Sequence, residues 1–237
     1  MTTIDTLSQI QDAVVNCRRC SRLVTWREES AVKKVRRYTK EKYWGKPLPG
    51  FGNNEAGLVV VGLAPAAHGG NRTGRMFTGD DSGEWLIRAM YQAGFANQEV
   101  SQSLHDGLML HNAYITAVVR CAPPQNRPTP EEIVSCLPYL AMELEILKPQ
   151  VVIALGRIAF DGVIKYLKQQ SAYPGGWQFR HGEQYPITAP YSMSVLASYH
   201  PSRQNTQTGR LTQSMLQAVF NRAQAILQAN QRPTSKN

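Results

Sequence analysis

Four cysteines are the residues of this 237-residue chain whose spacing most directly indicates metal chemistry. Cys17 and Cys20 form a C-x-x-C pair, whereas Cys121 and Cys136 lie on either side of a Pro-rich stretch and a predicted helix start. Four thiolates can hold a zinc ion or a [4Fe–4S] cluster. Zinc sites usually contain two close pairs, and only one pair is close here. The spacing therefore slightly favours a cluster, while zinc and four separate buried thiols stay open.

A second unusual stretch runs from Gly62 to Asp80 and is rich in glycine and alanine. Small residues let a ligand approach the backbone, whose N–H groups then serve as hydrogen-bond donors. The stretch is not a Walker loop, because no G-K-[ST] sequence follows, and it is not the dinucleotide-binding fingerprint. It is too specific to be ordinary turn chemistry, so we expect it to bind a ligand.

The hydrophobic pattern predicts the elements that position these residues. Short apolar, β-branched runs predict four buried strands, at residues 58–62, 114–119, 151–155 and 194–197. Apolar spacing and capping residues predict helices at 4–16, from Asp81 or Ser82, from Thr129, from 157 through Ile164, and at 211–227. We expect loops at 46–52 and 177–186, the latter with a hairpin as the alternative, and a disordered tail at 231–237.

Strands that alternate with helices predict a parallel sheet covered on both faces. We therefore expect an α/β fold, a three-layer α/β/α sandwich with a central, mostly parallel four-stranded sheet, in a single domain that spans residues 1–230. Ligands in such folds bind beyond the carboxyl ends of the strands. The stretches 62–79, 120–127 and 200–210 all follow predicted strands, so they should meet at one rim of the sheet.

The formal net charge of +9 favours a polyanionic partner such as nucleic acid. No apolar run reaches the roughly 18 residues of a membrane span, and the N-terminus lacks a signal-peptide pattern. We expect an unexported, cytoplasmic monomer, nucleoid-associated in a prokaryote. A solvated basic surface without a partner is the alternative. Basic and aromatic residues crowd into one segment: Lys33, Lys34, Arg36, Arg37, Tyr38, Lys40, Lys42, Tyr43, Trp44 and Lys46.

Several motifs together resemble those of the uracil-DNA glycosylase superfamily. The stretch 62–80 resembles its first motif and is closest to the family 5, or type B, branch, and Ser198-Tyr199-His200-Pro201-Ser202 resembles its second motif. The run 118–128 resembles the cluster-binding loop of the iron–sulfur branches. Cys17-Arg18-Arg19-Cys20 and Tyr43-Trp44-Gly45-Lys46-Pro47 resemble the N-terminal part of the type B pattern. The resemblance covers residues 10–225, nearly the whole chain.

The resemblance implies a monofunctional DNA repair glycosylase. Such an enzyme flips uracil out of the duplex, hydrolyses its N-glycosidic bond and leaves an abasic site. The resemblance also assigns a structural [4Fe–4S] cluster, with the ligands Cys17, Cys20, Cys121 and Cys136.

The resemblance further implies roles for individual residues. Phe77 would stack on the flipped base, and His200 would donate a hydrogen bond to the uracil O2 as negative charge develops there. A lone histidine is more often structural, but His200 follows a strand and precedes Pro-Ser. Ser202 and Arg203 would contact DNA. Four residues of the first motif would bind the base edge, chiefly through their backbone: Gly62, Ala64, Pro65 and Ala66.

The first motif lacks a residue that related branches use. They place an acidic or amide side chain there to orient the attacking water, whereas this chain has Leu63 and Ala64. The type B branch shares this feature. Asn71 and His68 are therefore the candidate catalytic residues for the water, and Asp80 is a weaker candidate that could simply cap the next helix.

The uracil-reading position also departs from the pattern. Family 4 relatives read uracil with an asparagine at the end of the second strand, where this chain has Ala117. Asn126 could substitute or could complete a turn. A pocket without this amide should be less strict, so we expect activity on hypoxanthine or other damaged bases as well. Two other functions stay open: a lesion-recognising DNA-binding protein of the same fold without excision activity, and a zinc-stabilised nucleotide-binding module.

Overall fold

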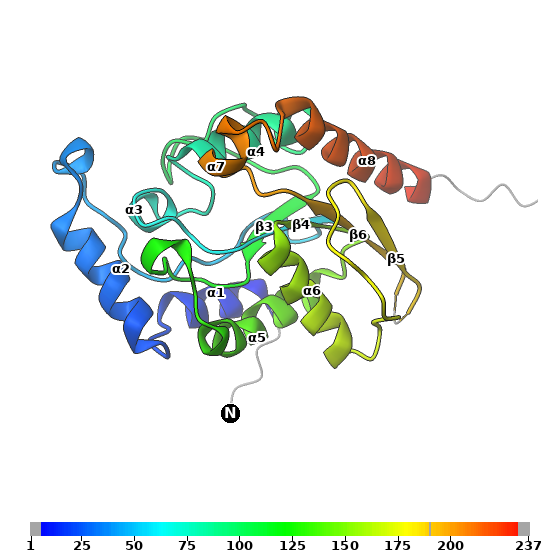
Figure 1. Cartoon of the computed structure of the whole chain (residues 1–237), viewed down its shortest axis with the longest axis horizontal. Coiled ribbons are helices and arrows are strands. Elements are labelled where there is room, and N and C mark those ends of the chain that lie inside the picture. Colours follow the sequence, from blue (N-terminus) through cyan, green and yellow to red (C-terminus); the bar gives the residue numbers. More distant parts are fainter. Residues whose placement is uncertain (1–5, 190, 232–237) are drawn as a thin grey trace, which may run out of the picture.

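The computed structural model describes residues 6–189 and 191–231, in which one mixed sheet of six strands forms the centre (Figure 1). The four middle strands are parallel, and the two edge strands are antiparallel to their neighbours. The expected α/β class is confirmed, but the expected four-stranded sheet was too small. In spatial order the strands are β1 (Phe51–Gly52), β3 (Ala113–Ala117), β2 (Leu58–Gly62), β4 (Val151–Leu155), β6 (Met193–Ser198) and β5 (Gln184–Ile187).

Helices cover both faces of the sheet, as expected for three layers (Figure 1). One face carries α1 (Leu7–Val15), α5 (Pro130–Leu147) and α6 (Arg157–Gln169), and the other carries α4 (Asp81–Gln92) and α8 (Gln213–Gln231). The remaining helical segments are α2 (Ser21–Lys33), η1 (Arg36–Tyr38), α3 (Gly70–Thr73), η2 (Pro124–Asn126) and α7 (Arg203–Gln207). Within the described residues no helix is long and apolar enough to cross a membrane.

Capping residues set the helix starts that the sequence predicted. The Thr129 side chain accepts a hydrogen bond from the Glu132 N–H and so completes a capping box at α5. The Asp80 side chain caps α4 in the same way through the Gly83 N–H. The predicted first helix begins at Leu7 after a Thr6 cap, and its residues 4 and 5 lie outside the described part of the chain, as do tail residues 232–237.

Several elements were not predicted, among them β1, which ends the segment expected to be a loop at 46–52. Two others, α2 and β5, have irregular patterns. Helix α2 buries Arg27 among its apolar residues, and a buried arginine interrupts the apolar spacing that indicates a helix. Strand β5 contains Pro186 within the expected hairpin or loop, yet proline is tolerated at a sheet edge. Tyr185 and Ile187 point inward from this half-buried strand.

Pairing between β2 and β3 continues beyond both strands. The Val118 N–H donates to the Gly62 carbonyl at 3.0 Å, and the Val119 N–H donates to the Leu63 carbonyl at 2.9 Å. Helix α6 packs closely on this extension, since a Cβ at Gly162 would lie 2.6 Å from a methyl of Val118. The segment that leads to Cys121 is therefore held between the sheet and a helix.

We expect Gly162→Ala to destabilise the protein although alanine favours helices. The helix gain is about 1 kcal/mol, whereas forcing a methyl into a packed contact costs about 1–3 kcal/mol. Urea unfolding should show a net loss of stability, and adding Val118→Ala should recover part of it in a double-mutant cycle. An increase in stability for Gly162→Ala alone would contradict the close packing.

Candidate functional site

The rings of Phe77 and His200 lie together where the parallel strands end. Their centroids are 5.9 Å apart, and their planes are tilted by 31°. Phe77 comes from the loop after β2, and His200 follows β6. The expectation that these two side chains meet at one rim of the sheet is confirmed.

The absence of a side chain at Gly62 gives the Phe77 ring its place. A Cβ at Gly62 would lie 2.8 Å from two carbons of that ring, which is closer than real Cβ contacts. Phe77 also has a φ of +50°, a value that is rare for a bulky residue. Strained backbone of this kind concentrates at functional sites. Gly62 thus acts here through the space it leaves open.

His200 is half-buried and electrically neutral. Desolvation lowers its pKa to about 4, so the ring carries one N–H donor and no charge at neutral pH. Its backbone carbonyl accepts hydrogen bonds from the Ser202 N–H and from the Asn205 side-chain amide, both at 2.8 Å. Gly156, with φ +89°, lets the His200 Cβ approach the start of α6.

A cavity of about 430 Å³ opens beside His200. Two arginines flank it on aromatic rings: the Arg157 guanidinium lies 5.7 Å from the Phe179 centroid, and that of Arg210 lies 4.6 Å from the Tyr199 centroid. This size is within the range of ligand pockets. Its lining consists of Leu63, Leu155, Gly156, Arg157, Ile158, Phe179, Tyr199, His200, Asn205 and Arg210.

Arg72 closes the loop between β2 and α4. Its Nε donates to the His68 carbonyl at 2.8 Å, and its Nη2 donates to the Gly79 carbonyl at 2.9 Å. The same guanidinium forms an ion pair with Glu41 and lies 3.9 Å from the centre of the Tyr38 ring. One buried arginine therefore joins the middle of the first motif, at His68, to its end, at Gly79, and joins both to η1.

The closed loop leaves backbone donors free. The N–H groups of Ala64, Ala66 and Ala67 have no hydrogen-bond acceptor among the described residues, and these alanines are only half-buried. Pro65 between them is buried and has no N–H. The Ala66 carbonyl, in contrast, accepts from the N–H groups of Gly69 and Asn71. The predicted backbone contact surface thus has donors available to a ligand.

His68 and Asp80 lie at this loop with partners of their own. The His68 Nδ1 is 3.1 Å from the Tyr43 hydroxyl, and burial lowers the pKa of His68, with a further contribution from the charge of Arg72. The Asp80 Oδ1 accepts from the Gly83 N–H at 2.9 Å, and its Oδ2 lies against Gly69. Burial raises the pKa of Asp80.

Asn71 lies in the interior rather than at an open site. Its side chain is fully buried, and its Nδ2 donates to the Arg27 carbonyl at 3.1 Å and to the Ala67 carbonyl at 3.4 Å. The amide therefore ties α3 to α2. Asn71 was a candidate for orienting the water; its Oδ1 has no partner among the described residues, but the side chain is enclosed.

The other predicted contact residues lie at the surface. Asn126 is exposed at the end of η2, has a φ of +56° and does not line the cavity, which corresponds to the turn alternative. Ser202 precedes α7 and is half-buried. Arg203 is exposed and forms an ion pair with Asp81 at the start of α4, so it lies at the rim near His200.

The four cysteines come together around a second cavity, although they lie far apart in the sequence. Burial raises the pKa of Cys121 to about 12 and that of Cys136 to about 11. The Arg120 N–H donates to the Cys136 Sγ at 3.3 Å. In residues 6–189 and 191–231, no three His, Cys, Asp or Glu side chains are arranged to hold a single metal ion. The four thiols that line this cavity are Cys17, Cys20, Cys121 and Cys136.

Sequence reasoning missed three residues of the site. Arg157 and Phe179 line the cavity, and Arg72 closes the first loop. Arg157 directly follows β4 and Gly156, so its place at a strand end was a usable signal. Phe179 lies in the segment expected to be an exposed hairpin or loop and offered no such signal.

Comparisons with known proteins agree with this geometry. A profile of the uracil DNA glycosylase superfamily matches residues 49–224. The type-5 uracil-DNA glycosylases of Pyrobaculum aerophilum and Thermus thermophilus are 49% and 48% identical to the chain, over 90% and 89% of its length and 89% and 93% of theirs. A type-4 uracil-DNA glycosylase of Archaeoglobus fulgidus is 35% identical over 84% of the chain and 83% of its own length. The chain therefore belongs to the uracil DNA glycosylase superfamily, in its type-5 branch.

Proposed function

We propose that this protein is a DNA repair glycosylase that hydrolyses the N-glycosidic bond of a flipped-out uracil and leaves an abasic site. The Phe77–His200 pair at the strand ends carries the proposal, because it places an aromatic face beside a neutral donor. The type-5 relatives are named for the same activity. A lesion-binding protein without excision activity has only the missing acid of the first motif in its favour.

The chemistry requires stabilisation of the base as it leaves with negative charge. Phe77 would stack on the flipped base, and the His200 N–H would donate to the uracil O2. The free N–H groups of Ala64 and Ala66 would add donors at the base edge. Since these groups are fixed before the substrate arrives, they need no reorganisation when charge develops.

The attacking water needs an acceptor at the first motif. Asn71 is fully buried between α2 and α3, and its Nδ2 donates to backbone carbonyls, although its Oδ1 has no partner among the described residues; the less buried candidates are His68 and Asp80. The Asp80 Oδ2 lies against the loop at Gly69, and the His68 Nδ1 has the Tyr43 hydroxyl as its partner. We infer that one of these two side chains orients the water.

His200→Ala should lower the single-turnover rate of uracil excision by about 10²–10³-fold, the usual cost of losing one donor to a developing anion.

Asn71→Ala should instead cost about 1–3 kcal/mol of unfolding free energy, because it leaves a buried carbonyl without its donor, and should leave the rate of the folded enzyme unchanged. The exposed His111→Ala serves as the control. A large rate loss with unchanged stability in Asn71→Ala would contradict the assignment of a structural role to Asn71 and a catalytic role to His200.

The pocket should accept bases other than uracil. The residue beside Gly62 in the β2–β3 register is Ala117, and Asn126 is exposed elsewhere, so no amide from these positions selects uracil. We expect excision of both uracil and hypoxanthine from paired oligonucleotides, with both activities lost in His200→Ala. Cleavage of uracil alone would refute the broader specificity.

The four cysteines fit a [4Fe–4S] cluster better than a zinc ion. The four thiols line one cavity, and the run 118–128 resembles the cluster-binding loop of the iron–sulfur branches, which favours the cluster. Cys17, Cys20, Cys121 and Cys136 would hold the cluster. The cluster would supply a structural link between the N-terminal helices, the loop after β3, and α5.

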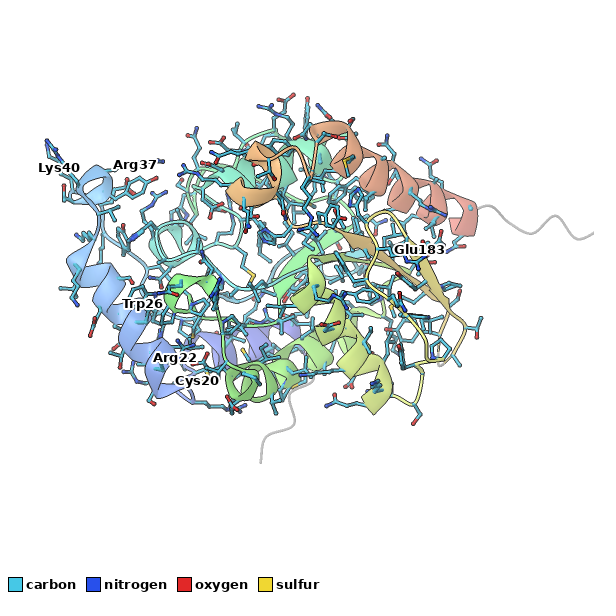
Figure 2. The ribbon with its side chains drawn as sticks, viewed as in Figure 1. Cys20, Arg22, Trp26, Arg37, Lys40 and Glu183 are labelled. Carbon is cyan, nitrogen blue, oxygen red and sulfur yellow. The ribbon has the colours of Figure 1, made fainter. Side chains whose placement is uncertain are left out.

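The basic segment around η1 is suited to the phosphates of the DNA duplex. Arg37 and Lys40 project at the tip of this segment, at the upper left of Figure 2. The pKa of Asp81 is lowered first by its hydrogen bond with Arg203 and further by the charge of Arg37. The positive charge of Arg37 therefore reaches Asp81, at the rim of the sheet where Arg203 of α7 also lies. Phosphate contacts from both sides would hold the duplex over His200.

Replacing Arg37 and Lys40 together by glutamine should weaken binding to undamaged duplex. The slope of log affinity against log salt should fall by about 2, since each lost phosphate contact removes about 0.9. The single-turnover rate at saturating enzyme should not change. Lys168→Gln, in the last turn of α6, is the matched control. An unchanged salt slope would show that the tip does not contact phosphates.

A further inference from the structure

The two largest fully buried side chains are both arginines, Arg27 and Arg120, each 1% exposed. Burying a guanidinium is costly unless its charge and its N–H groups find partners. Three of the six buried side-chain nitrogen and oxygen atoms that lack a partner among the described residues belong to these two arginines. Their surroundings should therefore contain something that the protein chain itself does not supply.

Arg120 lines the cavity of the four cysteines. Its Nη2 forms an ion pair with Glu143, which is fully buried in α5. Glu143 is fixed in turn by the hydroxyls of Tyr114 at 3.2 Å and Thr116 at 2.5 Å, both from β3. The Nε and Nη1 of Arg120 have no partner in the described part of the chain. One side of this guanidinium is thus anchored, and the other keeps two free donors.

Arg27 approaches the same site from α2. It lies one turn after Leu23 and Val24, which line the cysteine cavity, and its charge opposes the rise in the pKa of Cys121. Its Nη1 donates to the Gly45 carbonyl at 3.0 Å, and its Nη2 is 3.3 Å from the half-exposed Glu28 carboxylate. Its Nε has no partner among the described residues. Figure 2 shows Cys20 at the end of this helix.

Arg75 is a buried arginine away from the cysteines, and its hydrogen-bond donors have partners within the protein. It is 6% exposed, and its donors reach Asp106 at 2.7 Å, Ser101 at 2.9 Å and Thr78 at 3.0 Å. None of its nitrogens is among the unpartnered buried atoms of the described residues. Arg120, which lines the cysteine cavity, and Arg27, one turn beyond two of its lining residues, thus keep unpartnered donors, whereas Arg75 does not.

We propose that Arg27 and Arg120 are positioning residues of the four-cysteine site, where their free N–H groups and positive charge face the sulfur-ligated group. The inference rests on the proposed cluster. Four thiolates with a [4Fe–4S] core carry net negative charge, and hydrogen bonds to sulfur and nearby cations tune such clusters. Glu143 holds Arg120 in place for this role.

The test compares full-length variants purified without oxygen. Arg27→Met removes one cation, and the pair Arg120→Met with Glu143→Gln removes the other without leaving a buried carboxylate unpaired. Arg120→Lys keeps the charge and loses the planar donors. Arg75→Met is the control for loss of a buried arginine away from the cysteines. Iron content, the visible absorption in air, the midpoint reduction potential and the thermal unfolding midpoint are measured for each.

The Arg27→Met and Arg120→Met/Glu143→Gln proteins should lose visible absorption in air about tenfold faster than the parent, as is typical when second-sphere partners of a metal centre are removed. Their reduction potentials should be more negative. Arg27→Met removes a cation, and the Arg120→Met/Glu143→Gln pair, whose net charge does not change, removes the guanidinium and its N–H donors, which line the cysteine cavity where Glu143 does not. Arg120→Lys should fall between. Arg75→Met should unfold at lower temperature with an unchanged potential and rate of absorption loss.

Equal potentials and equal absorption loss in the parent and in these two proteins would overturn the inference and leave the cluster assignment intact. If Arg75→Met changed the reduction potential and the rate of absorption loss as much as the other variants do, the inference would also be overturned. The changes would then reflect general destabilisation of the fold. A parent protein without iron would refute the proposed cluster, and the inference would fall with it. The parent's iron content thus separates the two failures.

Discussion

Two backbone hydrogen bonds beyond the last residues of β2 and β3 hold the parts of the site in one register. They join Val118 to Gly62 and Val119 to Leu63. Gly62 leaves the space for the Phe77 ring, and Val119 leads directly to the residues at the cysteine cavity. One short backbone segment therefore links the proposed wall of the base site to the four-cysteine cavity. Through this connection the proposed cluster would influence base binding without any chemical step of its own.

The four parallel strands were predictable because each is buried on both faces and reads as a continuous apolar run. The edge strands lack this signal. Strand β1 has two residues, and β5 contains Pro186, which only an edge position allows. Helix α2 was not predicted for another reason: Arg27 lies on its buried face and donates to the Gly45 carbonyl, so tertiary contacts rather than apolar periodicity determine that face.

The sequence predicted those site residues whose chemical type suits the function and which also directly follow a parallel strand. Phe77 and His200 follow different parallel strands, and the topology alone brings such positions together. Asparagine side chains were not predictable in the same way. The direction of the Asn71 amide depends on the Arg27 carbonyl, 44 residues away, and Asn126 completes a turn of η2. Local sequence indicates that an amide is present but does not give its partner.

The electrostatics of the His200 cavity suit a reaction whose substrate base is uncharged and becomes negative only as its bond breaks. Among the described residues that line it, none is an aspartate or glutamate, and burial keeps His200 neutral. Arg157 and Arg210 lie on aromatic rings at its edge and bring positive charge to it, which would suit the phosphates of a DNA substrate. A neutral ring N–H and peptide N–H groups bind an uncharged base only weakly. In the proposed reaction their interaction would grow as the glycosidic bond breaks and the base becomes an anion, so most of their stabilisation would be gained in the transition state, as catalysis requires.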